Sequence, residues 1–101
     1  MAAFEDHVRQ ALDSLAPEIA MHLQNVAIVV EDANPDDPDL LGLFEADEFM
    51  PARIAIYRLP LEEEFGDDPA RLREEIRVTV LHELAHYFGI DEDRLDELGY
   101  G

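Results

Sequence analysis

The sequence DPARLREEIRVTVLHELAHYFG, residues 68–89, predicts the longest helix of the chain. Asp68 is a residue type that caps helices, and Pro69 suits the first helical position, where its missing N–H is not needed. Gly89 can take the left-handed conformation with which many helices end. Between these ends, apolar residues recur every four positions, as on the buried face of a helix: Leu72, Ile76, Val80, Leu84 and Phe88.

The last two turns of this predicted helix contain the motif His82-Glu83-Leu84-Ala85-His86. Histidines four residues apart lie on one face of a helix, so both imidazoles can bind one metal ion. Glu83 lies one residue further round the helix, where its carboxylate can reach a water molecule at the metal without being a ligand. Zinc lowers the pKa of such a water to about 7, and a carboxylate can then remove its proton during attack on a carbonyl group. The motif predicts His82 and His86 as zinc ligands and Glu83 as the catalytic base.

Two histidines do not complete a zinc site, which needs a third protein ligand. Because Gly89 ends the helix soon after His86, the chain can turn back and bring a residue near position 92 to the same ion. Glu92 occupies that position, and Asp91 and Asp93 beside it are the alternatives. Acidic residues in the first turn of a helix are also stabilised by the helix dipole without any metal. We therefore expect Glu92 as the third ligand, with Asp91 or Asp93 as substitutes.

The segments before this helix predict a mixture of helix and strand. Apolar residues at steps of three or four predict a helix in residues 4–23, in which Pro17 either begins a second short helix or kinks a single long one. Apolar or alternating segments predict three strands, at residues 26–30, 40–45 and 53–59. The last strand alternates polar and apolar residues, so it could lie at an edge of the sheet and receive an extended peptide there, although an exposed edge is equally well explained by ordinary sheet ending.

Two further segments complete the prediction. Residues 61–68 are acidic and read as irregular, and residues 91–98 read as a short closing helix. The sequence therefore predicts an α+β fold. A chain of 101 residues has room for one hydrophobic core, and we expect a single domain over residues 1–101.

Composition limits where the protein acts. Apolar residues make up 48% of the chain and are interrupted by charge throughout, so no segment predicts a membrane span. The N-terminus becomes acidic at Glu5 and Asp6, whereas a secretory signal needs a basic start and an apolar stretch. We therefore expect a cytoplasmic protein.

Charge and cysteine content limit the chemistry. The chain has no cysteine, so a disulfide framework, a thiolate metal site and a cysteine nucleophile are excluded. The formal net charge of −18 repels nucleic acid and anionic lipid and favours cations or a basic protein partner. Most of the acidic side chains are expected to serve solubility.

The motif and its surroundings resemble a known family. His82-Glu83-Leu84-Ala85-His86-Tyr87-Phe88-Gly89-Ile90-Asp91-Glu92 resembles the extended motif of metzincin peptidases, in which a third ligand follows the glycine by three residues. Metzincins have His or Asp there and a methionine turn after the motif, whereas this chain has Glu92 and no later methionine. A closer resemblance is to the small bacterial minimal zincins, or zincin-like metallopeptidase domains.

Three stretches carry this closer resemblance, which covers roughly residues 25 to 100: residues 41–45, residues 65–69 and residues 82–98. It implies an N-terminal helix, a small mixed β-sheet, an active-site helix and a short C-terminal helix. It also implies a peptidase function. Because few residues follow His86, the site is expected to be open and shallow.

Three functions are compatible with the sequence. The first is a zinc-dependent peptidase acting on a peptide or protein substrate. The second is an acidic, metal-binding interaction module without turnover, and the third is an interaction domain that binds no metal. Tyr57, Tyr87 and Tyr100 are candidates for stabilising negative charge on a substrate, although packing or surface roles explain them as well.

Overall fold

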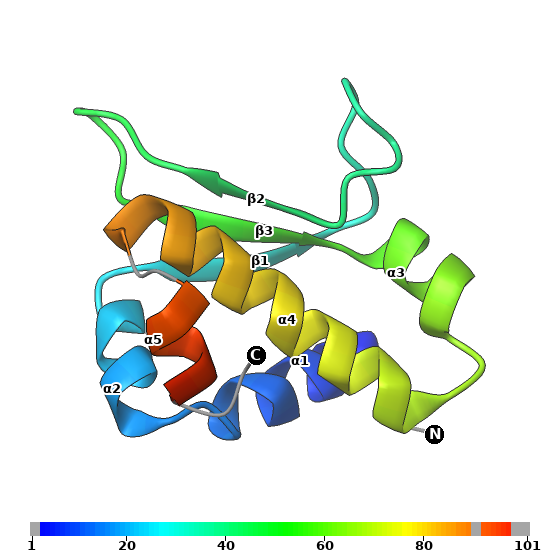
Figure 1. Ribbon diagram of the computed structural model, residues 1–101. Coiled ribbons are helices and arrows are strands. Elements are labelled where there is room, and N and C mark those ends of the chain that lie inside the picture. Colours follow the sequence, from blue (N-terminus) through cyan, green and yellow to red (C-terminus); the bar gives the residue numbers. More distant parts are fainter. Residues whose placement is uncertain (1–2, 90–91, 98–101) are drawn as a thin grey trace.

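The computed structural model describes residues 3–89 and 92–97. Figure 1 shows a small sheet with helices packed mainly on one of its faces. The elements in chain order are α1 (Phe4–Asp13), α2 (Pro17–Ala20), the 3-10 turn η1 (Met21–Leu23), β1 (Ala27–Glu31), β2 (Gly42–Glu45), β3 (Arg53–Tyr57), α3 (Arg58–Phe65), α4 (Pro69–Phe88) and α5 (Glu92–Glu97). The predicted α+β fold is confirmed.

Helix α4 begins and ends as predicted. The Asp68 side chain accepts hydrogen bonds from the backbone N–H groups of Ala70 and Arg71, and Pro69 occupies the first helical position. The helix ends at Gly89, which has a left-handed backbone with φ of 68°. At the other end of the chain, Pro17 begins the short helix α2, so the N-terminal region is two helices and not one kinked helix.

Helix α3 was not predicted. The sequence indicated a strand through residue 59 followed by irregular structure, but β3 ends at Tyr57 and Arg58 begins a helix. Pro60 is tolerated because it lies in the first turn, where backbone N–H groups have no partner within the helix. The Arg58 side chain pairs with Glu62 at 2.7 Å, and Leu61 is fully buried in the core. The glutamates that made this segment look irregular are good helix formers, and Leu61 gives the helix a buried side.

The sheet has the strand order β1-β3-β2. Strand β3 pairs in parallel with β1 and antiparallel with β2, so it is the central strand. The reading that it could lie at an edge was wrong, because β3 is paired on both sides, and Ala55 and Tyr57, on the face read as exposed, are buried. Tyr57 is covered by the β1–β2 loop, where the Asn34 side-chain N–H donates to its hydroxyl at 3.0 Å. The open edges belong to β1 and β2.

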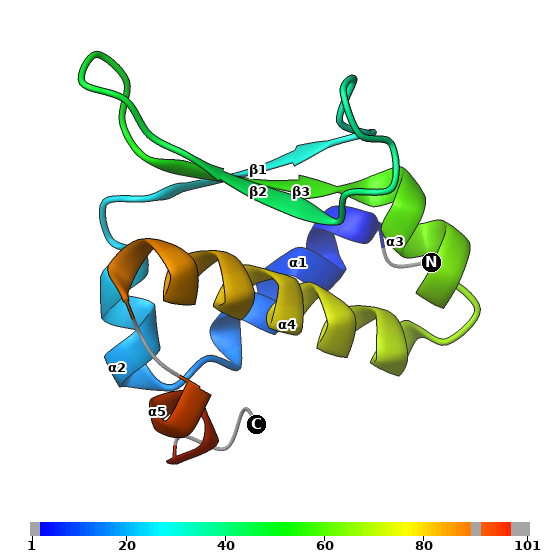
Figure 2. The same cartoon turned by 45° about the horizontal axis from the view of Figure 1, so that its top comes forward.

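The core lies between the sheet and two helices. Figures 1 and 2 show α1 and α4 beside each other below the same face of the sheet, with α2 and α5 near the C-terminal end of α4. The buried core side chains are Phe4, Val8, Ala11, Leu15, Ile19, Ile54, Ile56, Leu61, Leu72, Ile76, Val80, Leu81 and Leu84. This packing holds α4 against the β2 side of the sheet.

None of the helices in residues 3–89 and 92–97 is long and apolar enough to cross a membrane.

Candidate functional site

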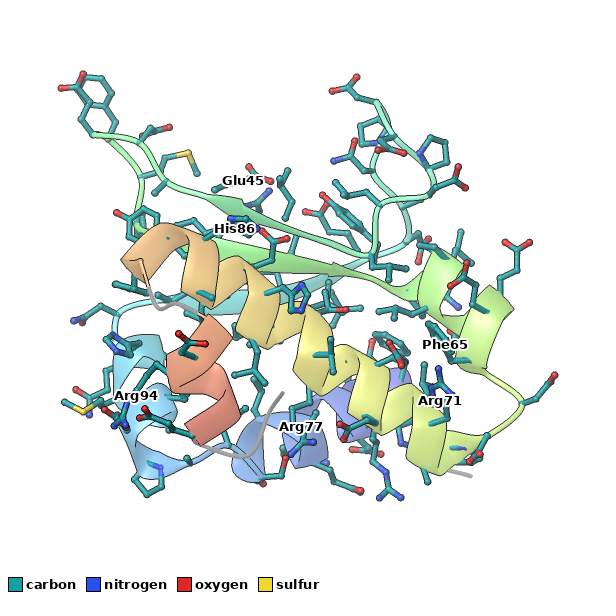
Figure 3. The ribbon with its side chains drawn as sticks, in the orientation of Figure 1. Glu45, Phe65, Arg71, Arg77, His86 and Arg94 are labelled. Carbon is teal, nitrogen blue, oxygen red and sulfur yellow. The ribbon has the colours of Figure 1, made fainter. Side chains whose placement is uncertain are left out.

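The predicted metal-binding residues lie on the solvent side of α4. Leu81 and Leu84 are buried in the core, whereas His82 and His86 are exposed and Glu83 is half-buried. Figure 3 shows His86 between α4 and strand β2, near Glu45 of that strand. The helix therefore buries one face in the core and presents both imidazoles beside the sheet edge.

Glu83 is attached to the edge strand. The backbone N–H of Phe44 in β2 donates to Glu83 Oε2 at 3.0 Å. This contact joins the predicted catalytic base to a strand 39 residues away in sequence. It holds one carboxylate oxygen in a fixed place next to the open edge of the sheet.

Gly42 allows β2 to lie this close to α4. A Cβ atom at Gly42 would be 2.5 Å from Thr79 Cγ2 and 3.9 Å from Glu83 Cγ. Any larger residue would push the strand away from the helix. A glycine inside a strand often marks such a close backbone approach.

The outer edge of β2 has backbone groups that a peptide could use. The Tyr57 N–H donates to the Leu41 carbonyl, so the backbone groups of Leu41 face β3. Along an antiparallel strand, backbone groups face the partner strand at every second residue, so those of Leu43 face β3 as well. Gly42 and Phe44 then direct their N–H and C=O groups outward, and the Phe44 N–H is the one bound to Glu83. The open edge thus runs directly beside the predicted catalytic base.

Two hollows flank this edge. The first, of about 420 Å³, is lined by Asp37, Asp39, Leu40, Leu41, Gly42, Glu75, Val78, Thr79, His82 and Glu83. The second, of about 320 Å³, is lined by Phe44, Glu45, Ala46, Asp47, Met50, Pro51 and Arg53. Both are open to solvent.

The tyrosines have packing roles. Tyr57 is 1% exposed and bonded to Asn34, so it cannot contact a substrate. Tyr87 is exposed and stacks on Phe44 with ring centroids 4.1 Å apart, which adds a second contact between α4 and β2. Tyr100 lies outside the described residues.

The third ligand stays a prediction. Glu92 begins α5, but its side chain and the whole of Asp91 lie outside what the structure describes, and the Asp93 side chain is exposed. Within residues 3–89 and 92–97, no three His, Asp or Glu side chains are grouped closely enough to share an ion.

Helix α5 is attached to α2 by an ion pair between Arg94 and Glu18, and Arg94 also pairs with Glu97 at 2.7 Å. The hydrogen bond from Arg94 lowers the pKa of Glu18 below its ordinary value of 4.5. The segment that carries the candidate third ligands therefore begins a helix whose position is set by α2.

Sequence reasoning missed the residues that β2 and the β1–β2 loop contribute to the site. Residues 40–45 were predicted as a strand, without a role for Phe44 or Gly42. The glycine inside a strand was the one available signal. Every residue except proline has a backbone N–H, so the identity of Phe44 could not indicate its hydrogen bond to Glu83.

A comparison with protein families identifies the family of this chain. A family model described as zincin-like metallopeptidase matches residues 23–101. The match begins after α1 and α2 and includes all three strands, α4 and α5. A comparison with curated proteins found no match. Since the family model covers most of the sequence, the chain belongs to the zincin-like metallopeptidase family.

Proposed function

We propose that this protein is a zinc-dependent peptidase in which His82 and His86 bind the metal and Glu83 is the catalytic base. The contact between Glu83 and the Phe44 N–H is the observation that supports this best, because it puts the carboxylate at the strand edge where a peptide can add. The family match supports a hydrolytic function for the same segment.

The available donors fit zinc. Two imidazoles four residues apart on one helix, both open to solvent, match the nitrogen donors of catalytic zinc sites, and a carboxylate commonly completes the set. We assign the third position to Glu92, with Asp91 or Asp93 as the alternatives. When bound, zinc would polarise the carbonyl of the substrate and make water a nucleophile near neutral pH.

The chain's own residues supply substrate binding and proton transfer. The outward N–H and C=O of Gly42 and the C=O of Phe44 pair with an extended peptide, as in strand addition. Glu83 accepts a proton from the water that attacks the carbonyl carbon and delivers it to the leaving amine when the C–N bond breaks. The Phe44 N–H holds Oε2, so Oε1 is the oxygen that we assign to proton transfer.

Metal analysis is the first test. Protein purified without added metal is expected to contain about one zinc per chain by plasma mass spectrometry, and the His82→Ala/His86→Ala variant is expected to contain none. His22→Ala is the matched control, since His22 lies on η1 at no ligand spacing and is expected to leave the zinc in place. A double variant that keeps its zinc would refute the site.

Hydrolysis is the second test. On a library of fluorescence-quenched peptides, Glu83→Gln is expected to lose about 10²–10⁴-fold in rate and to retain zinc. Glu64→Gln, on the exposed surface of α3, is the matched control and should behave as wild type. Full activity in Glu83→Gln would disprove the role of the base. Bound zinc without any hydrolysis in the wild type would favour the interaction module.

The third ligand can be assigned by zinc affinity. Glu92→Gln is expected to weaken zinc binding in competition with a chromogenic chelator, while Asp93→Asn and Asp91→Asn leave it unchanged. If one of the aspartate variants loses affinity instead, that residue is the ligand.

A further inference from the structure

We propose that the free edge of strand β1 is an interface through which two copies of this chain form a dimer. The two β1 strands pair antiparallel and join the two three-stranded sheets into one continuous sheet. This edge lies on the other side of the sheet from β2, the strand that is bound to Glu83. The inference is therefore independent of the proposed peptidase function, and both β2 edges stay open in the dimer.

The pairing of β1 with β3 fixes which backbone groups of β1 face outward. The Ala27 N–H donates to the Ala52 carbonyl, so the backbone groups of Ala27 face β3. Backbone groups change sides at each successive residue of a strand, so those of Val29 also face β3 and those of Ile28 and Val30 face outward. Within the part of the chain that the structure describes, β1 has no second strand beside it, so these outward N–H and C=O groups have no strand partner.

One antiparallel register uses all of the outward groups. When the pairing is centred on Val29, Ile28 lies opposite Val30 of the second copy, and each such pair exchanges two N–H···O bonds. A pairing centred on Ile28 or on Val30 would leave the other residue opposite a position outside β1. The two-fold axis therefore passes beside Val29, and both copies contribute the same residues to the interface.

The side chains that meet in this register are apolar. Figure 2 shows β1 at the rear of the sheet, with α1 behind α4. Ile28 and Val30 point to the helix face and line an open groove of about 280 Å³ between β1 and α1. The residues of α1 that line this groove are Val8 and Leu12 and the charged residues Glu5, Arg9 and Asp13. In the dimer, Ile28 and Val30 of both copies lie side by side along the groove, and the two Val29 side chains meet on the opposite face of the sheet.

The β1 edge lacks the features that normally keep edge strands from pairing. Its first four residues, Ala27 to Val30, are all apolar and include no lysine or proline. The register with β3 is continuous from end to end, so no bulge turns the edge away. Only Glu31, the last residue of β1, is charged.

Charge complementarity favours a second copy of this chain as the partner. In the register centred on Val29, Glu31 of the second copy lies opposite Ala27, and Arg53 is the neighbour of Ala27 on β3. The Cα atoms of Arg53 and that glutamate are then two strand spacings apart, about 10 Å, which an arginine and a glutamate can span over the small Ala27 side chain. Arg53 already contacts Glu31 of its own chain at 3.4 Å, so its guanidinium lies on this face of the sheet. The one charged residue of β1 thus approaches an arginine and not a second carboxylate.

Disulfide trapping tests the register, because the chain has no cysteine of its own. In the proposed dimer the two Val29 residues form a non-hydrogen-bonded pair with Cα atoms about 4.5 Å apart, which a disulfide can bridge. Full-length Val29→Cys, oxidised with glutathione disulfide, is expected to run mainly as a covalent dimer on a non-reducing gel. Ala27→Cys is the matched control, since its Cα atoms in the two copies are four residues apart along the strands, about 13 Å, and cannot be bridged.

Sedimentation equilibrium measures association without a cross-link. Wild-type protein is expected to reach twice the monomer mass, and the dimer should strengthen with salt, because salt screens the repulsion between two chains of net charge −18. Val29→Lys places two ammonium groups opposite each other at the axis and is expected to raise the dimer Kd about five-fold or more. Glu64→Gln, on the exposed surface of α3, changes the net charge by the same one unit and is expected to dimerise like the wild type. Circular dichroism checks that the Val29→Lys variant is folded.

Three results would overturn the proposal: wild-type protein that stays monomeric at every concentration and salt condition, a dimer that Val29→Lys leaves unchanged, or equal cross-linking of Val29→Cys and Ala27→Cys. The proposed function fails or stands separately. A monomeric wild type that hydrolyses peptides would refute the dimer and leave the peptidase in place.

Discussion

Strand β2 approaches helix α4 closely at Gly42, and the Gly42→Ala substitution tests whether that approach is required. The new Cβ would lie 2.5 Å from Thr79 Cγ2 and 3.2 Å from the Ala55 carbonyl oxygen. Carbon atoms in ordinary contact are about 3.5–4.0 Å apart, so the strand or Thr79 must move by about 1 Å. Thr79 cannot turn freely, because its side chain is β-branched and its hydroxyl donates to the Glu75 carbonyl at 2.8 Å.

The expected loss of stability follows from two opposing effects. Overpacking of this kind destabilises a protein by about 1–3 kcal/mol. Alanine also restricts the unfolded chain, which offsets about 0.4–1 kcal/mol. We expect Gly42→Ala to lower the free energy of unfolding by about 1–2 kcal/mol, with a fall in Tm of about 4–8 °C for each kcal/mol. Urea unfolding followed by circular dichroism measures the change.

Thr79→Ser provides the matched control. Serine keeps the hydroxyl that bonds to the Glu75 carbonyl but lacks the methyl group that the new Cβ at position 42 would contact. The double variant Gly42→Ala/Thr79→Ser is therefore expected to be more stable than the sum of the two single changes predicts, by about 0.5 kcal/mol or more. Wild-type stability in Gly42→Ala, or strict additivity of the two changes, would refute this account of β2 and α4.

Replacing Asp68 by alanine removes the side chain that caps α4 and is expected to lower the free energy of unfolding by about 1 kcal/mol; Asp68→Asn, which can still cap, should have little effect. Gly89→Ala meets no atom within 4 Å but must adopt φ of 68°, so urea unfolding should show a loss of about 1–2 kcal/mol that comes from the backbone alone. Glu18 has a lowered pKa in the folded protein, so its pair with Arg94 stabilises the fold above pH 4.5 and is lost as the pH falls through the lowered pKa. An NMR titration of the Glu18 carboxyl should show a pKa below 4.5, and Arg94→Gln should raise it; an unchanged pKa in Arg94→Gln would contradict the assigned cause.

Local sequence signals were sufficient for some elements. The limits of α4 follow from Asp68, Pro69 and Gly89, whose capping roles depend on the residues themselves and their immediate neighbours. Helix α3 and the central place of β3 were not predictable in this way. The residues after Tyr57 were read as irregular, although glutamates favour a helix and Pro60 is tolerated in its first turn, and the burial of Leu61 against distant segments fixes where this helix lies.

The candidate site likewise combines residues that local sequence identifies with residues that only the packing of distant segments brings together. His82, Glu83 and His86 are recognised from spacing, because a helix places residues four apart on one face wherever it lies in the protein. Phe44 is close in space to that helix but not in sequence, and its contribution to the candidate site is a backbone N–H bound to Glu83.

For this protein, the sequence by itself determined the α4 helix, the spacing of His82, Glu83 and His86 along it, the excess of negative charge and the α+β class. Each of these depends on periodicity, capping or composition, which act over a few residues or over the whole chain. The tertiary structure decided which strands form the edges of the sheet and how closely β2 approaches Glu83. These features depend on how distant segments pack, because hydrogen bonds and burial across the core are set only when the strands and helices are brought together.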